Sequence, residues 1–323
     1  MSGRTMHNSA IGRGGQWFGR TVTPVLVVVA TLLAIWYVAV VPMNIHGTVN
    51  LGRVHGFDAV PAGRKDRAGT GVLSMIMQNP RAIPFTMNED KPRLPAPHQV
   101  ATELIKATLG TAPSSKRSLV FHAWATLSAT LLGFVIGTVA GTLLAVGIVF
   151  NRAMDMSVMP WAIASQTIPI LAIAPMVIVV LASIGVTGLL PKSLISAYLS
   201  FFPVVVGMVK GLRSPDHMQL DLLKTYYASS AQSFWKLRLP ASVPYLFASL
   251  KIGAAASLVG TIVAELPSGG GRGLGARLLA GSYYGQTIQI WSALFMAAIV
   301  AACVVGFIGM VERSAIRRMG IGA

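Results

Sequence analysis

Charged side chains are scarce in this sequence. Only 11% of its 323 residues are charged, whereas 54% are hydrophobic, and an average soluble domain has about 25% charged residues. A water-soluble globule needs a polar surface, and this composition supplies too little to cover one. Uncharged apolar runs of about 18 residues or more are typical of bilayer-spanning helices, because roughly 20 helical residues cross about 30 Å of hydrocarbon. We therefore expect an integral membrane protein and not a soluble enzyme.

Cysteine and metal-ligating clusters are scarce as well. The one cysteine, Cys303, lies in an apolar run, so the sequence excludes a disulfide scaffold, a Cys-based zinc site and CxxC redox chemistry. His122 and His217 lie near the ends of apolar runs, with no second ligand at metal-binding spacing. We therefore expect no metal site.

A phosphate-binding loop is also missing. No Gly-Lys dipeptide occurs, so there is no Walker A loop to hold the phosphates of ATP. The Gly-rich stretch at 268–275 does not have the G-x-G-x-x-G spacing and follows an apolar run instead of a strand; its composition is typical of a flexible outer loop. We expect this chain to bind no cofactor.

The sequence has instead a large excess of basic residues, with a formal net charge of +16. Nucleic-acid binding needs a basic soluble face, but here Lys and Arg lie mainly between the apolar runs. Cations in such places fix membrane topology and meet anionic lipid. We expect contact with membrane lipid and none with nucleic acid.

Six apolar runs predict an all-α membrane protein with about six transmembrane helices. The runs are, in chain order, 21–41, 119–150, 156–184, 194–209, 242–264 and 288–310. The first exceeds a normal signal-peptide core and no persuasive cleavage site follows it, so we interpret it as an uncleaved helix. Gly133, Gly137 and Gly141 permit close helix contact in lipid. Prolines 160, 169 and 175 predict a kinked third span that faces protein or a cavity.

The polar segments complete the domain plan. Residues 43–118 hold ten Lys/Arg and five Asp/Glu and lie outside the bilayer, with short surface helices expected at 71–78 and 100–109. In chain order, we expect an amino-terminal arm at 1–20, the first transmembrane helix at 21–42 and an outer segment at 43–118. A core with five spans and a polar inner loop at 210–240 follows at 119–312, and a tail at 313–323 ends the plan.

The distribution of cations predicts the orientation. With the amino terminus inside, the short inner segments hold twelve Lys/Arg and the short outer loops only three, Lys192, Arg272 and Arg277. The long 43–118 segment is excluded from this comparison, because long translocated loops escape the positive-inside rule. We therefore expect both termini in the cytoplasm.

The inner loop at 221–240 carries the most informative motif. Ser229 with Gln232 fits a capping box, so one short helix is expected to end near Ala228 and a second to begin at Ser229. The loop also holds a set of apolar residues, namely Leu222, Leu223, Tyr226, Tyr227, Phe234 and Trp235. These side chains either dock a soluble partner or pack on the ends of neighbouring helices.

This loop resembles the cytoplasmic EAA loop of permease subunits of binding-protein-dependent ABC importers, which reads roughly E-A-A-x3-G-x9-I-x-L-P. Its acidic residue, two alanines, glycine, isoleucine and final pair fall, in that order, on Asp221, Leu222, Leu223, Tyr227, Leu237, Leu239 and Pro240. Ala228 and Ser229 follow the glycine position, as they often do in the family. The bulky Tyr227 in place of glycine predicts a differently shaped turn.

Other stretches look like the sulfonate, taurine and nitrate branch of that family. In chain order they are Leu94-Pro95-Ala96-Pro97, Phe121-His122 with Leu132-Gly133-Phe134, Ile168-Pro169, Ala174-Pro175, and Ala264-Glu265 with Gly273-Leu274-Gly275. The likeness covers about residues 94–312; residues 43–93 look like an added outer insert.

The resemblance implies a type I ABC importer fold and its partners. Two permeases, either two copies of this chain or this chain with a sister permease, form the pore. A cytoplasmic dimer of ATPase subunits, which holds the ATP and Mg, drives the loop, and an external binding protein delivers the solute. The solute is sulfonate-, taurine- or nitrate-like, or a nitrogen heterocycle.

Five residues are candidates for the solute pathway: Gln166, Pro169, Pro175, Lys251 and Glu265. Charged groups in or near spans tend to be functional or paired. Glu265 could instead be a helix-end charge, and Lys251 could snorkel or meet a partner subunit.

Two rival functions stay open on the sequence alone. An ion-coupled secondary transporter usually has acidic groups at mid-membrane, and no span here has one. A membrane-embedded enzyme needs a convergent cluster of His, Asp, Glu or Cys, and ten acidic residues, half of them in the outer segment, leave little to build it.

Overall fold

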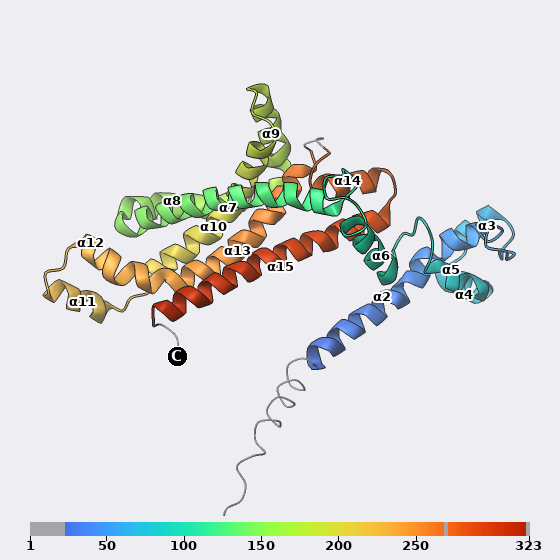
Figure 1. Cartoon of the computed structure of the whole chain (residues 1–323), viewed down its shortest axis with the longest axis horizontal. Helices are drawn as coiled ribbons and strands as arrows, with labels where there is room; N and C mark the ends of the chain where they lie inside the picture. The colour runs from blue at the N-terminus through green and yellow to red at the C-terminus, as the bar shows by residue number, and fades with distance from the viewer. Residues whose placement is uncertain (1–22, 268–270, 321–323) are drawn as a thin grey trace, which may run out of the picture. The chain divides into compact units, whose positions relative to one another are not determined.

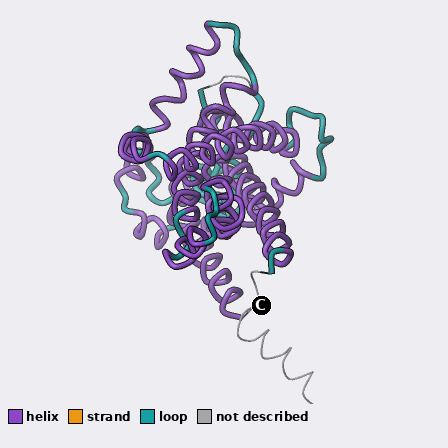
Figure 2. The backbone as a smooth tube through the Cα atoms, turned by 90° about the vertical axis from the view of Figure 1, so that its left-hand side faces the viewer, coloured by secondary structure: helices purple, strands orange, loops and turns teal. Residues whose placement is uncertain are grey.

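All regular secondary structure in the described part of the chain is helical (Figure 2). The computed structural model describes residues 23–267 and 271–320. The all-α prediction is therefore confirmed. The predicted amino-terminal arm at 1–20 lies outside the described residues, as do residues 268–270 of the Gly-rich stretch.

Five helices among the described residues are long and apolar enough to cross a membrane, and a bent helix pair makes six if it counts as one span. They are, in chain order, α2 (Thr23–Asn50), α7 (Leu119–Phe150), the pair α8 (Arg152–Ser165) and α9 (Ile170–Ser183), α10 (Leu189–Leu212), α13 (Leu239–Glu265) and α15 (Thr287–Arg318). Each predicted apolar run falls on one of these elements, which confirms the prediction of about six spans.

The third predicted span is broken into two helices, where we expected one kinked helix. α8 and α9 meet at 97°. Pro169 stands just before α9 in an extended conformation, with ψ at 113°. Proline disfavours helical backbone at the residue before it and donates no amide hydrogen bond, so the helix stops there. Pro160 and Pro175, by contrast, lie inside α8 and α9.

The chain divides into two compact units. One comprises the chain up to Glu103 together with Gly285–Trp291, and the other comprises Leu104–Tyr284 together with the chain from Ser292. The short helices of the first are α3 (Arg64–Gly69), α4 (Val72–Gln78), η2 (Pro80–Ala82), α5 (Ile83–Thr86) and the start of α6 (Pro97–Thr108). α4 and α6 confirm the two predicted surface helices.

The first unit has a small core of its own, built on the end of α2. This helix continues beyond the predicted end of the span to Asn50, because Ile45 and Val49 are buried against Phe57 and Met75. Asn44 of α2 holds the segment at 86–94 against this helix. Its side-chain amide group donates to the carbonyls of residues 86 and 94, and its side-chain oxygen accepts from the backbone amides of residues 93 and 94.

The second unit is centred on α10, which packs along both α7 and α13 (Figure 1). The contact with α7 is close because glycines of α7 face serines of α10. A Cβ on Gly137 would lie 2.1 Å from the Oγ of Ser200. On the other side, the hydroxyl of Ser196 in α10 bonds the carbonyl of Ser257 in α13 at 2.9 Å. The predicted close packing around Gly133, Gly137 and Gly141 is confirmed, and α10 is the partner.

Candidate functional site

The loop between α10 and α13 folds into three short helical pieces. They are α11 (His217–Thr225), α12 (Ser230–Ser233) and the π-helical turn η3 (Phe234–Arg238), which runs directly into α13. The Ser229 hydroxyl accepts from the Gln232 amide at 3.2 Å, and the Gln232 side chain accepts from the Ser229 amide at 2.8 Å. The predicted break and capping box are thus confirmed.

The turn between α11 and α12 is a left-handed helix cap formed by a tyrosine. Tyr227 has φ +51° and is the one non-glycine residue with positive φ in the described part of the chain. Its amide bonds the carbonyl of Lys224 at 2.9 Å, and the amide of Ala228 bonds the carbonyl of Leu223 at 3.0 Å. This pair of bonds defines a Schellman cap, which glycine usually supplies. Tyr227 thus takes a backbone conformation that suits glycine, and the expectation of a turn shaped differently from that of the family stays a prediction.

The surface of this loop is unusually apolar. The exposed fraction is 97% for Tyr227, 76% for Tyr226 and 57% for Leu222, while Leu223 is half-buried. Side chains that packed on neighbouring helix ends would be covered. The exposed surface therefore favours docking over local packing for these residues.

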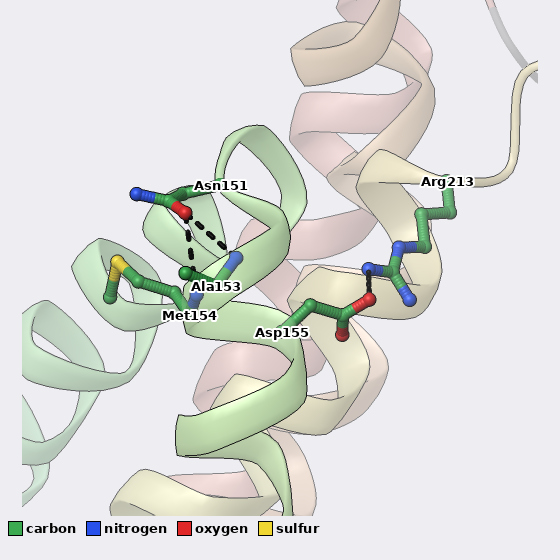
Figure 3. A network of polar contacts seen from close by, with 5 residues as sticks. All are labelled: Asn151, Ala153, Met154, Asp155 and Arg213. Carbon is green, nitrogen blue, oxygen red and sulfur yellow. Dashed lines mark hydrogen bonds and ion pairs between the residues drawn. The ribbon is translucent and has the colours of Figure 1, made fainter.

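The entry to the loop is fixed by an ion pair. Arg213, just after α10, contacts Asp155 in the first turn of α8 at 2.8 Å (Figure 3). The side chain of Asn151 accepts from the amides of residues 153 and 154 and so caps α8. The start of α8 and the end of α10 are thereby held together, next to the first residue of α11.

The exit from the loop is fixed as well. The guanidinium of Arg238 donates to the carbonyl of Leu212, the last residue of α10, at 3.0 Å. It also lies 5.9 Å from the ring centroid of Phe150, which is edge-on to Phe234. Both ends of the loop are therefore attached to the ends of long helices: the entry to the start of α8, and the exit to the ends of α7 and α10.

Asp221 lies on the exposed face of α11. Its carboxylate accepts a hydrogen bond from Lys224 at 2.8 Å. This bond and the positive charge of Lys224 hold the pKa of Asp221 below its ordinary value. Asp221 is therefore ionised at neutral pH and presents a charged edge beside the apolar residues.

Glu265, the last residue of α13, is completely buried. Its carboxyl group accepts from the Thr126 hydroxyl of α7 at 2.9 and 3.0 Å and from the amide of Gly275 at 2.8 Å. A Cβ on Gly273 would lie 2.1 Å from the Glu265 carboxyl. Glu265 therefore joins α7, α13 and α14 (Leu274–Tyr283), and residues 273–275 are packed, where we expected a flexible loop.

Lys251 is paired within the chain. Its ammonium contacts the Glu312 carboxylate of α15. Fourteen residues separate Lys251 from Glu265 on α13, about 21 Å at 1.5 Å per residue. These two candidates therefore do not share one site.

The other pathway candidates lie at the break between α8 and α9. Gln166 ends α8, Pro169 precedes α9 and Pro175 lies inside it, all exposed. The Tyr198 hydroxyl of α10 donates to the Ser165 carbonyl and so attaches the break to the core. The roles of these residues in solute passage stay predictions.

The residues that anchor the loop were missed from the sequence. Asp155, Arg213 and Arg238 are single charges far apart in the chain, without a local pattern. Near these anchors, one local pattern could have been recognised in the sequence: Asp216 and Gln219 are three residues apart, and the Gln219 side chain accepts a hydrogen bond from the Asp216 amide at the start of α11.

Comparison with known families agrees with this geometry. Residues 133–318 match the family described as "Binding-protein-dependent transport system inner membrane component". The chain belongs to this family. The match begins within α7 and includes the whole loop with its anchored ends.

Named relatives of this permease transport different solutes. It is 30% identical to the formylaminopyrimidine transport permease protein ThiX of Halalkalibacterium halodurans over 183 residues, 56% of this chain and 68% of that one. It is 30% identical to the riboflavin transport system permease protein RibX of Chloroflexus aurantiacus over 227 residues, 69% of this chain and 80% of that one. It is 24% identical to the putative aliphatic sulfonates transport permease protein SsuC of Bacillus subtilis over 186 residues, which are 58% of this chain and 66% of that one.

Proposed function

We propose that this permease forms half of the pore of an ATP-driven importer and that its 210–240 loop receives the force of a separate cytoplasmic ATPase dimer. The observation that carries this proposal is a loop with exposed apolar residues at its centre and both ends attached to membrane helices. Such a loop can bind a soluble protein and transmit its movement. A secondary transporter has no need of it.

The second permease is a second copy of this chain or a sister chain. Support comes from α8 and α9, whose apolar side chains are largely uncovered: the exposed fraction is 78% for Trp161 and 68% for Met176. These helices suit contact with a partner subunit, with the solute or with lipid.

The solute is a small molecule delivered by an external binding protein. The names of ThiX and RibX indicate nitrogen heterocycles, and that of SsuC indicates sulfonates. Binding of pyrimidines, flavins, alkyl sulfonates, taurine and nitrate to the cognate binding protein, measured by calorimetry, identifies the class.

ATP-driven uptake by reconstituted proteoliposomes tests the proposal. Leu223→Asp or Tyr227→Asp should abolish both uptake and capture of the cognate ATPase by the purified permease, because a charge enters the apolar docking surface. Ser314→Asp, an exposed change at the end of α15, is the matched control and should leave both intact. Uptake in the absence of any ATPase would refute the mechanism.

A further inference from the structure

A cavity of about 580 Å³ lies between the start of α7, the end of α9 and the start of α10. Most of its wall is apolar. Phe121 and Trp124 of α7, Ile178 of α9 and Val186 of the following turn all line it. Trp124 is 69% exposed, although it is a large aromatic side chain. The 210–240 loop lies at the other end of α10, so the cavity is separate from the site formed by that loop.

Two cations stand in the wall of this cavity. Lys192 donates a hydrogen bond to the backbone carbonyl of Arg272 at 3.1 Å, and the Arg272 guanidinium lies 5.5 Å from the ring centroid of Phe121. Within residues 23–267 and 271–320, no carboxylate forms an ion pair with either of them. Lys192 interacts electrostatically with the buried Glu265, whose carboxyl group also accepts a hydrogen bond from Thr126. The cavity therefore combines a long apolar wall with a pair of positive charges.

We propose that the cavity binds one anionic phospholipid. The phosphate lies between Lys192 and Arg272, and one acyl chain follows Trp124, Ile178 and Val186. Lipid combines a fixed anion with a hydrocarbon chain, as the lining requires. The place is also suitable, because α7 and α10 both begin here. Helix ends in a bilayer lie at the headgroup level, where tryptophan and basic side chains gather.

Charge argues against a second copy of this chain as the occupant. A two-fold interface centred on this cavity would bring the same two cations of both copies close together. Of the other carboxylates of this unit, Asp155, Asp221 and Glu312 are in ion pairs, and Asp216 is the N-cap residue of α11, in the loop at the other end of α10. A lipid phosphate meets the charge requirement without any such residue.

Quenching of tryptophan fluorescence by brominated lipid tests the proposal on the full-length permease in detergent. Phosphatidylglycerol with brominated acyl chains should quench one tryptophan saturably, and Trp124→Phe should remove that component. Phosphatidylcholine with the same chains should need about tenfold more lipid, because basic residues at the surface attract anionic headgroups. Inorganic phosphate alone should not displace the phosphatidylglycerol.

Three variants separate the contribution of the two charges from that of the cavity. The double variant Lys192→Gln with Arg272→Gln should weaken phosphatidylglycerol binding about tenfold. The double variant Arg317→Gln with Arg318→Gln removes the same charge from an exposed helix end and should bind as the parent does. Ala182→Phe fills the cavity, leaves both cations and should abolish quenching. Equal quenching by both lipids, or unchanged binding in the first double variant and in Ala182→Phe, would overturn the proposal.

Discussion

At the scale of single residues, Tyr227 has a backbone conformation that its side chain disfavours. Its positive φ costs a non-glycine residue about 1–2 kcal/mol. The turn nevertheless forms because the Schellman bonds end α11 and the capping box of Ser229 starts α12. The capping box was readable from the sequence because its partners are three residues apart. The turn was not, because tyrosine by itself disfavours it.

Tyr227→Gly should therefore stabilise the turn by about 1 kcal/mol, since glycine adopts positive φ freely. The amides of residues 222–229 should exchange more slowly with deuterium in the variant. Tyr227→Ala, which removes the ring and keeps the strain, is the control and should not slow exchange. If glycine and alanine had equal effects, the strain assigned to this turn would not exist.

At the scale of elements, the contact between α7 and α10 depends on the absence of side chains. A Cβ on Gly137 would collide with Ser200 and lie 2.9 Å from the Ala197 carbonyl. Gly137→Leu should lower the stability of the permease by 3 kcal/mol or more, on the order of the largest overpacking penalties. Thermal unfolding in detergent measures it. Gly306→Leu on α15 is the matched control, since nothing lies within 4 Å of its Cβ position; similar losses in both variants would contradict this account of the contact.

The lobe formed by the end of α2 and the chain that follows contains a buried carboxyl group, that of Glu89. Burial raises the pKa of Glu89 above its ordinary value, although the Thr48 hydroxyl donates to it at 3.1 Å. The folded lobe therefore holds this proton more tightly than the unfolded chain. Protonated Glu89 contributes its full share to the stability of the lobe below pH 4.5, the ordinary pKa of a glutamate. This contribution is lost as the pH rises through the higher pKa that Glu89 has in the folded lobe.

Glu89→Gln should remove this loss and protect the lobe at neutral pH. Hydrogen exchange of residues 44–50, measured from pH 4 to pH 8 and corrected for intrinsic rates, should show opening that increases with pH in the parent and less so in the variant. Asp58→Asn, a change at an exposed carboxylate of the same lobe that is not among the charges acting on Glu89, should behave like the parent. A parent lobe whose stability rose with pH would reverse the sign of the argument.

The break in the third span could not be predicted from the sequence pattern. Three prolines indicated distortion, but a proline inside a membrane helix is tolerated when neighbours satisfy the freed carbonyl. Pro160 and Pro175 lie inside helices that continue past them. The break falls at Pro169, where the hydrogen bond of Tyr198 to the Ser165 carbonyl attaches the end of α8 to α10, a tertiary contact that the sequence pattern does not show.

At the scale of the whole molecule, the spans were predictable because a bilayer requires continuous apolar runs of fixed length. The network at Glu265 was not, because Thr126 is 139 residues from it in the sequence and joins Glu265 and Gly275 only on folding. The packed lobe at the end of α2 was missed because its core residues are scattered through a polar segment without a strong period.

Orientation is the claim on which the whole account depends, because an ATPase reaches only a cytoplasmic loop. With Cys303 replaced by serine, Gln219→Cys on the exposed face of α11 provides a single thiol for a membrane-impermeant maleimide. We predict labelling in inside-out vesicles and none in intact cells until the membrane is broken. Labelling of Gln219→Cys in intact cells would place the loop on the outside and contradict the coupling mechanism.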